Sequence, residues 1–191
     1  MVYNKKISSS GFALLITLVV ISVVISIGIT LIDLTLKQLR LANSSKDSET
    51  AFHASNAGVE CIRHWRVASF TAFETPLQVV PLSCFDVAAS TVPSYLGTTG
   101  VYSHDLEITW GPPNARRCSR IKMITLSPDF TASVTYTNAN IRGIIPGYPV
   151  GPDKICVAGG RCSIISVQGY NRPCTQTSEL GTIQREVLLE L

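Results

Sequence analysis

The sequence lacks charge where it is most apolar, because no charged residue stands between Lys6 and Asp33. Charged residues make up 15% of the 191 residues and the formal net charge is +3. Removal of residues 1–11, which contain two lysines, would lower that net charge from +3 to +1. A nearly neutral chain has no strong field of one sign that would attract nucleic acid or anionic lipid to the whole molecule.

Catalytic motifs are also absent. The chain contains no G-x-S-x-G, H-E-x-x-H or Walker-type glycine loop, and its three histidines are dispersed. Asp105 and Glu107 alternate along an expected strand but form no paired-carboxylate motif. We therefore expect a protein that is not an enzyme and that needs no cofactor and no metal. An enzyme anchored to a membrane is the least favoured of the alternatives.

No C-x-x-C pair occurs among the six cysteines, and this spacing argues against a zinc site. An even number of cysteines, all downstream of the apolar run, indicates disulfides in an oxidising, exported compartment. Six cysteines allow 15 pairings, among which sequence does not choose. Cys61 with Cys84 would staple a helix to the segment after it. Cys162 with Cys174 would leave Cys118 with Cys156, and Cys156 with Cys162 is an equally tenable alternative.

Proline is absent from Phe12 to Trp65, so a helix that starts near Phe12 has no reason to stop early. Residues 12–32 are apolar apart from Ser, Thr and Gly, and about 21 such residues suffice to cross a bilayer. A secretory signal has a shorter apolar region and ends in a small-residue cleavage site, whereas Asp33 and further charges follow here. A permanent membrane anchor and a processed assembly helix remain as alternatives.

Orientation in the membrane follows from Lys5 and Lys6, which favour a cytoplasmic N-terminus. Residues 33–66 then continue the helix outside the membrane with an amphipathic pattern. The residues expected on its inner face are Leu41, Ala51, Phe52, Ala54, Gly58, Val59, Cys61, Ile62 and Trp65. We expect a helix of about 55 residues, half in lipid and half packed on a soluble domain.

Residues 67–191 read as an exported β-rich domain. TPLQVVPLSCF reads as a short extended piece bracketed by prolines. Strands are expected in DLEITW, SRIKMITL and ASVTYTN, with CSIISVQGYN and TIQREVLLEL as two closing antiparallel strands. The stretches GPPNARR and IPGYPVGPDK read as turns or loops. The fold class is therefore α+β, with one long N-terminal helix packed on a disulfide-stabilised antiparallel sheet of about four to six strands.

At this point the chain resembles a known family. A short basic leader, Gly11, Phe12, a long apolar helix and an amphipathic continuation are similar to type IV pilin-like proteins with a class III prepilin signal peptide. The stretch SETAFHASNAGVEC, Ser48–Cys61, is similar to the A-F-x-A-x-x-A-G-x-E segment of minor pilins of the PilX kind. The resemblance covers about the first third of the chain and extends weakly to VQGYN and REVLLEL.

The resemblance implies a structural minor pilin or pseudopilin. A prepilin peptidase would cut between Gly11 and Phe12, and Phe12 would become the N-methylated first residue of the mature chain. Other pilin subunits, an assembly ATPase and a platform membrane protein would be partners, and the exported domain would reach the cell surface for adhesion, tip priming or ligand capture. The competing hypothesis is an anchored extracellular binding domain that never polymerises.

One residue departs from the family pattern. The fifth residue of the mature chain, usually glutamate in pilins, is Ile16, which favours a minor or tip subunit over a self-polymerising major pilin. Ser22, Ser26 and Gly28 give the apolar helix small positions where neighbouring helices can approach closely, although serine can instead bond its own helix carbonyls.

The one basic cluster comprises Arg116, Arg117, Arg120 and Lys122. These cations could contact phosphates, and minor pilins as a group include DNA-binding members. No adjacent aromatic residues offer stacking platforms in the sequence, so that a solvated loop leading into a strand is the favoured interpretation.

Overall fold

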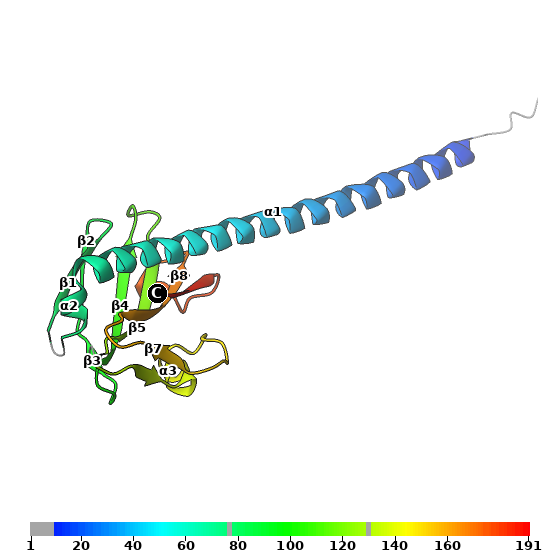
Figure 1. Ribbon diagram of the computed structural model, residues 1–191. Coiled ribbons are helices and arrows are strands. Elements are labelled where there is room, and N and C mark those ends of the chain that lie inside the picture. The colour runs from blue at the N-terminus through cyan, green and yellow to red at the C-terminus, as the bar shows by residue number, and fades with distance from the viewer. Residues whose placement is uncertain (1–9, 76–77, 129–130) are drawn as a thin grey trace, which may run out of the picture. The chain divides into compact units, whose positions relative to one another are not determined.

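The computed structural model describes residues 10–75, 78–128 and 131–191, with side chains from residue 11 onward. It divides between Ser45 and Lys46 into two compact units. Helix α1 (Ser10–Ala68) contributes to both, and its 59 residues confirm the expected long helix. The α+β class is confirmed as well, because the second unit is built on antiparallel strands (Figure 1).

The first unit is an apolar helix with almost no buried surface. Large apolar side chains from Phe12 to Leu41 are all exposed, Phe12 by 72%. Within the described residues, α1 is the one helix that is long and apolar enough to cross a membrane. Leu41, expected on the packed face, is 73% exposed and belongs to this unit.

The second unit contains a five-stranded antiparallel sheet of order β3-β4-β5-β8-β9. Two-stranded sheets β1-β2 and β6-β7 flank it. The strands are β1 (Val80–Cys84), β2 (Val87–Thr91), β3 (Ser94–Tyr95), β4 (Val101–Trp110), β5 (Arg117–Leu126), β6 (Val134–Tyr136), β7 (Lys154–Cys156), β8 (Cys162–Tyr170) and β9 (Gln184–Glu190). The short helices are α2 (Phe70–Phe73), α3 (Asn138–Ile144) and the 3₁₀ turn η1 (Cys174–Gln176).

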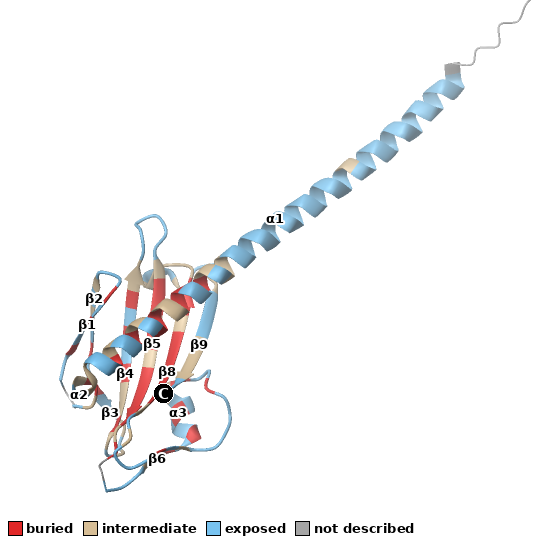
Figure 2. Ribbon diagram, turned by 45° about the horizontal axis from the view of Figure 1, so that its top comes forward, coloured by how far each residue is buried: buried red, intermediate tan, exposed pale blue. Residues whose placement is uncertain are grey.

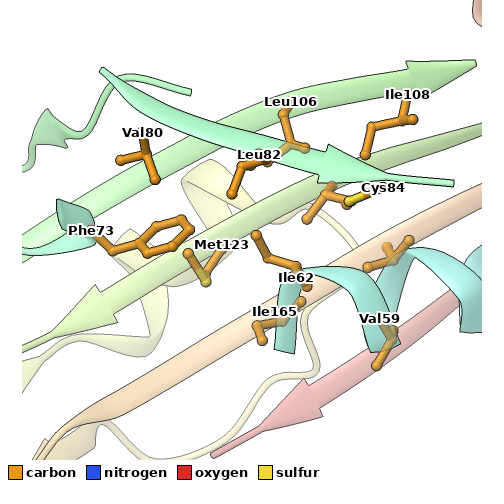
Figure 3. Packing of buried hydrophobic residues seen from close by; sticks show 12 residues of the cluster. Val59, Ile62, Phe73, Val80, Leu82, Cys84, Leu106, Ile108, Met123 and Ile165 are labelled. Atoms are coloured by element: carbon orange, nitrogen blue, oxygen red, sulfur yellow. The ribbon is translucent and has the colours of Figure 1, made fainter. Parts of the chain in front are cut away.

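Two apolar cores form because side chains alternate along β5. Ile121 and Met123 belong to a core with Val59, Ile62, Phe73 and Ile165, shown in Figure 3, which joins α1 and α2 to the sheet. Ile124 and Leu126 belong to a second core with Tyr136, Ile141 and Tyr148, from β6, α3 and the loop after it. The central strands are thus covered on both faces.

Small residues let α1 lie very close to the sheet, as the buried stripe along its second half shows (Figure 2). Ala51, Ala54 and Ser55 are fully buried, and Ser119 Oγ donates a 2.7 Å hydrogen bond to the Ala54 carbonyl. A Cβ added to Gly58 would lie only 2.7 Å from Val167 Cγ1. Most of the inner face is as expected, but Phe52 is 48% exposed, so its expected burial is wrong.

Candidate functional site

Gly11 and Phe12, the predicted processing site, lie in the first turn of α1. Both residues are exposed, and among the described residues nothing beyond the adjoining backbone of the helix lies within 4 Å of a Cβ built on Gly11. Lys5 and Lys6, with the rest of residues 1–9, lie outside the described residues. The site is therefore sterically open on the side that belongs to the helix, and its processing stays a prediction.

The predicted helix-packing residues do not share one face of α1. Ser22 and Ser26 lie one turn apart, whereas Gly28 is about 200° further round the helix than Ser26. Ser22 Oγ donates a 2.8 Å hydrogen bond to the Val19 carbonyl of its own helix. A Cβ on Gly28 would meet no atom of the described residues within 4 Å apart from the adjoining helix backbone. The small positions thus offer two separate faces to neighbouring helices.

Three disulfides staple the second unit. The predicted Cys61–Cys84 bond, which joins α1 to β1, is confirmed, as is the alternative Cys156–Cys162. The pairing of Cys162 with Cys174, which would leave Cys118 with Cys156, is wrong. Cys162 begins β8 and Cys174 follows its far end, about 25 Å along the strand. Cys118 lies opposite Tyr170 in the register and therefore bonds Cys174, with Cα atoms 4.8 Å apart.

The neighbouring strand supplies carboxylates to two of the four cations in the basic cluster. The β4-β5 register places Glu107 opposite Arg120 and Asp105 opposite Lys122. Arg120 forms an ion pair with Glu107, and Lys122 Nζ lies 4.0 Å from an Asp105 carboxylate oxygen. Two of the four cations are therefore matched by the two carboxylates that the sequence showed as an unexplained alternating pair.

The remaining cations and the aromatic neighbours differ from expectation. Arg117 lies over the Trp110 ring, 5.7 Å from its centroid, and Arg120 lies over the Tyr170 ring. The prediction that aromatic residues are absent beside this cluster is wrong, because strand pairing brings Tyr170 in from 50 residues away. Arg116 is exposed in the loop before β5.

A buried polar cluster at the C-terminal end of α1 was not predicted. Arg66 is only 5% exposed; its Nε donates to Ser163 Oγ at 2.8 Å and its Nη2 contacts Glu74 Oε1 at 2.7 Å. Arg161 Nε lies 3.9 Å from the other Glu74 oxygen. The helical spacing of Arg66 from Ile62 was the one available signal, because it continues the buried face.

His104 lies near Arg66 and packs against Phe73 of the first core. Its Nε2 shares a 3.2 Å hydrogen bond with Thr125 Oγ1, and its ring meets Phe73 edge-on. Burial, assisted by the charge of Arg66, lowers the pKa of His104 from 6.5 to about 4. The imidazole is therefore neutral at physiological pH, and its role here is one of packing.

Comparison of the chain with protein-family models, with curated proteins and with solved structures finds no match. The structure itself shows a long N-terminal apolar helix, packed through its second half on a disulfide-bonded antiparallel sheet. This arrangement is compatible with a pilin-like fold.

Proposed function

We propose that this chain is a structural, non-enzymatic minor subunit of a type IV pilus or of a type II secretion-like pseudopilus. The observation that carries the proposal is the difference between the two halves of α1. One half exposes apolar side chains over its whole circumference, and the other half packs on a stapled sheet. Such an apolar helix needs lipid before assembly and can exchange it for neighbouring helices afterwards.

In this proposal the chain inserts with its N-terminus in the cytoplasm, and a prepilin peptidase removes residues 1–11. An assembly ATPase and a platform protein then move it into a filament at the cell surface. Ile16 in place of the usual glutamate favours a minor position, since the apolar helix then offers no carboxylate to a neighbouring N-terminal amine. The second unit faces outward for adhesion, tip priming or ligand capture.

The processing step is tested by replacing Gly11 with Val. A β-branched residue at the cut should obstruct a peptidase that accepts an extended, unhindered backbone. Mass spectrometry of the membrane fraction should then find a chain that retains residues 1–11, whereas the wild type begins at N-methylated Phe12. Gly28→Val, the matched glycine in the same helix, should be processed normally. Normal processing of Gly11→Val would contradict the assigned site.

Ile16 also supports a second candidate, a permanently anchored extracellular binding domain that does not polymerise. That candidate requires mature protein with an intact Met1 and no chain in sheared filaments. DNA is not part of either proposal, because Glu107 and Asp105 pair with Arg120 and Lys122. If Arg116, Arg117 and Arg120 were all changed to Ala, any salt-sensitive DNA binding that persisted would have to reside elsewhere.

A further inference from the structure

Three charged residues share one face of α1 just beyond its most apolar part. Asp33, Lys37 and Arg40 follow one another at spacings of four and three residues, which places them within about 60° around the helix. All three belong to the first unit and are exposed. The ion pairs of the described residues include none of them. Along the helix this face therefore presents one acid and then two bases.

The rest of the helix surface at this level is apolar. Leu34, Leu36, Leu39 and Leu41 are 49–73% exposed. They follow residues 12–32, whose length already suffices to cross a bilayer. Lipid tails therefore leave these leucines uncovered, and a neighbouring helix would remove them from water.

A second copy of the chain carries the charges that match this face. Charges beside an apolar helix contact decide which helices pair and in what register. Copies in one membrane are parallel and lie at equal depth, where Asp33 would meet Asp33 and Lys37 would meet Lys37, and like charges repel. If one copy moves outward by four to seven residues, or about 6–10 Å, its Asp33 comes to lie opposite Lys37 and Arg40 of its neighbour. The offset replaces repulsion by attraction.

We propose that Asp33 of one copy pairs with Lys37 and Arg40 of a second copy, with the two helices offset by one to two turns and the leucines packed around the ion pairs. This inference rests on the proposed function, because a subunit takes such an offset when it leaves the bilayer for a filament. Copies of this minor subunit then lie next to each other in the filament.

Cross-linking with a carbodiimide, which joins a carboxylate directly to a lysine amine in contact with it, tests the pairing. Sheared filaments are treated, and covalent dimers of this chain are separated from monomers on a denaturing gel, so that a bond within one chain does not count. Mass spectrometry of the dimer should find Asp33 joined to Lys37. The membrane fraction, in which the copies lie at equal depth, should contain no such dimer.

Matched variants show whether charge sets the contact. Asp33→Asn should remove the dimer, whereas Asp86→Asn, at an exposed acid in the β1-β2 turn, should retain it. Asp33→Lys should remove it as well. Addition of Lys37→Asp and Arg40→Asp to that chain reverses all three charges and should restore the dimer, which a role of Asp33 within the single chain would not do.

The outcomes separate this pairing from the filament proposal. If the chain is present in sheared filaments but forms no dimer through Asp33, or if the charge-reversed chain forms none, the pairing alone is wrong. An equal yield of the dimer in the membrane fraction would overturn the offset. If the chain is absent from sheared filaments, the proposed function fails and the pairing fails with it.

Discussion

Gly169 in β8 sets how closely α1 approaches the sheet. A Cβ at this position would overlap the Ala51 carbonyl oxygen and the Ser55 nitrogen, which are backbone atoms of the helix. Backbone cannot move aside as a flexible side chain does, so that any larger residue must push the helix away. The packing of the first core thus depends on the lack of a side chain at Gly169.

Gly169→Ala should therefore destabilise the second unit by about 3 kcal/mol, at the upper end of the usual cost of overpacking. For a domain of this size that corresponds to a fall of roughly 6–12 °C in melting temperature. Thermal unfolding of the full chain, followed by near-UV circular dichroism, measures it. Gly143→Ala in α3 is the control, because its Cβ meets open space and alanine favours helix. Equal melting temperatures for the two variants would contradict the close approach.

His104 should make stability depend on pH. Its pKa is about 4 in the folded chain and 6.5 when exposed, so that the unfolded chain binds more protons between these values. Stability is therefore complete above pH 6.5 and falls as the pH drops toward 4. Between pH 7 and pH 5 the loss should be about 2 kcal/mol.

Urea unfolding at these two pH values tests the effect. His104→Gln should remove most of the difference, while His64→Gln, at an exposed position on α1, should retain it. An unchanged pH dependence in His104→Gln would assign the titration to other groups.

At the scale of elements, the disulfides differ in the length of chain that they close. Cys118–Cys174 spans 56 residues and Cys156–Cys162 spans 6. In the chain-entropy model these loops correspond to about 4 and about 2 kcal/mol of stability. Paired alanine variants should therefore lower the urea midpoint more for the first disulfide than for the second. The reverse order would show that the short loop, which holds Arg161, stabilises the domain by contacts instead.

Gly28 tests the role of the apolar half of α1. Since its surroundings are open in the single chain, Gly28→Leu should not change the melting temperature of the second unit. If Gly28 faces a neighbouring helix, the added side chain should reduce the amount of protein in sheared filaments several-fold. Val24→Leu, which adds bulk where a large residue already stands, is the control. Equal incorporation of both variants would remove Gly28 from the helix interface.

The elements that the sequence predicted well are those with strong periodic patterns. α1, β4, β5, β8 and β9 were expected because they are long and regularly patterned. The β1-β2 hairpin was not expected, since its turn uses Phe85 and Asp86, both at positive φ, in place of the usual Asn-Gly.

The polar cluster around Arg66 was even harder to predict from the sequence than the β1-β2 hairpin. Arg66, Glu74 and Arg161 are brought together by tertiary packing, and no local spacing relates residue 66 to residue 161. The disulfides lie between these extremes. The β5-β8 register places Cys118 opposite Tyr170, four residues before its partner Cys174, but the register itself is not readable from cysteine positions.

At the scale of the whole molecule, the two units differ in where their apolar side chains lie. Residues 11–45 expose apolar side chains that need lipid or other helices, while Lys46–Leu191 has two apolar cores and three disulfides of its own. A chain so divided is suited to exchange the surroundings of its helix without unfolding its second unit, as the proposed filament subunit requires.

Mass spectrometry of sheared surface filaments tests this account most directly. We expect the filament fraction to contain this chain beginning at N-methylated Phe12, with three intact disulfides and in small amount beside a major subunit. A chain that is found only in the membrane fraction, with Met1 intact, would contradict the account and leave the permanent anchor.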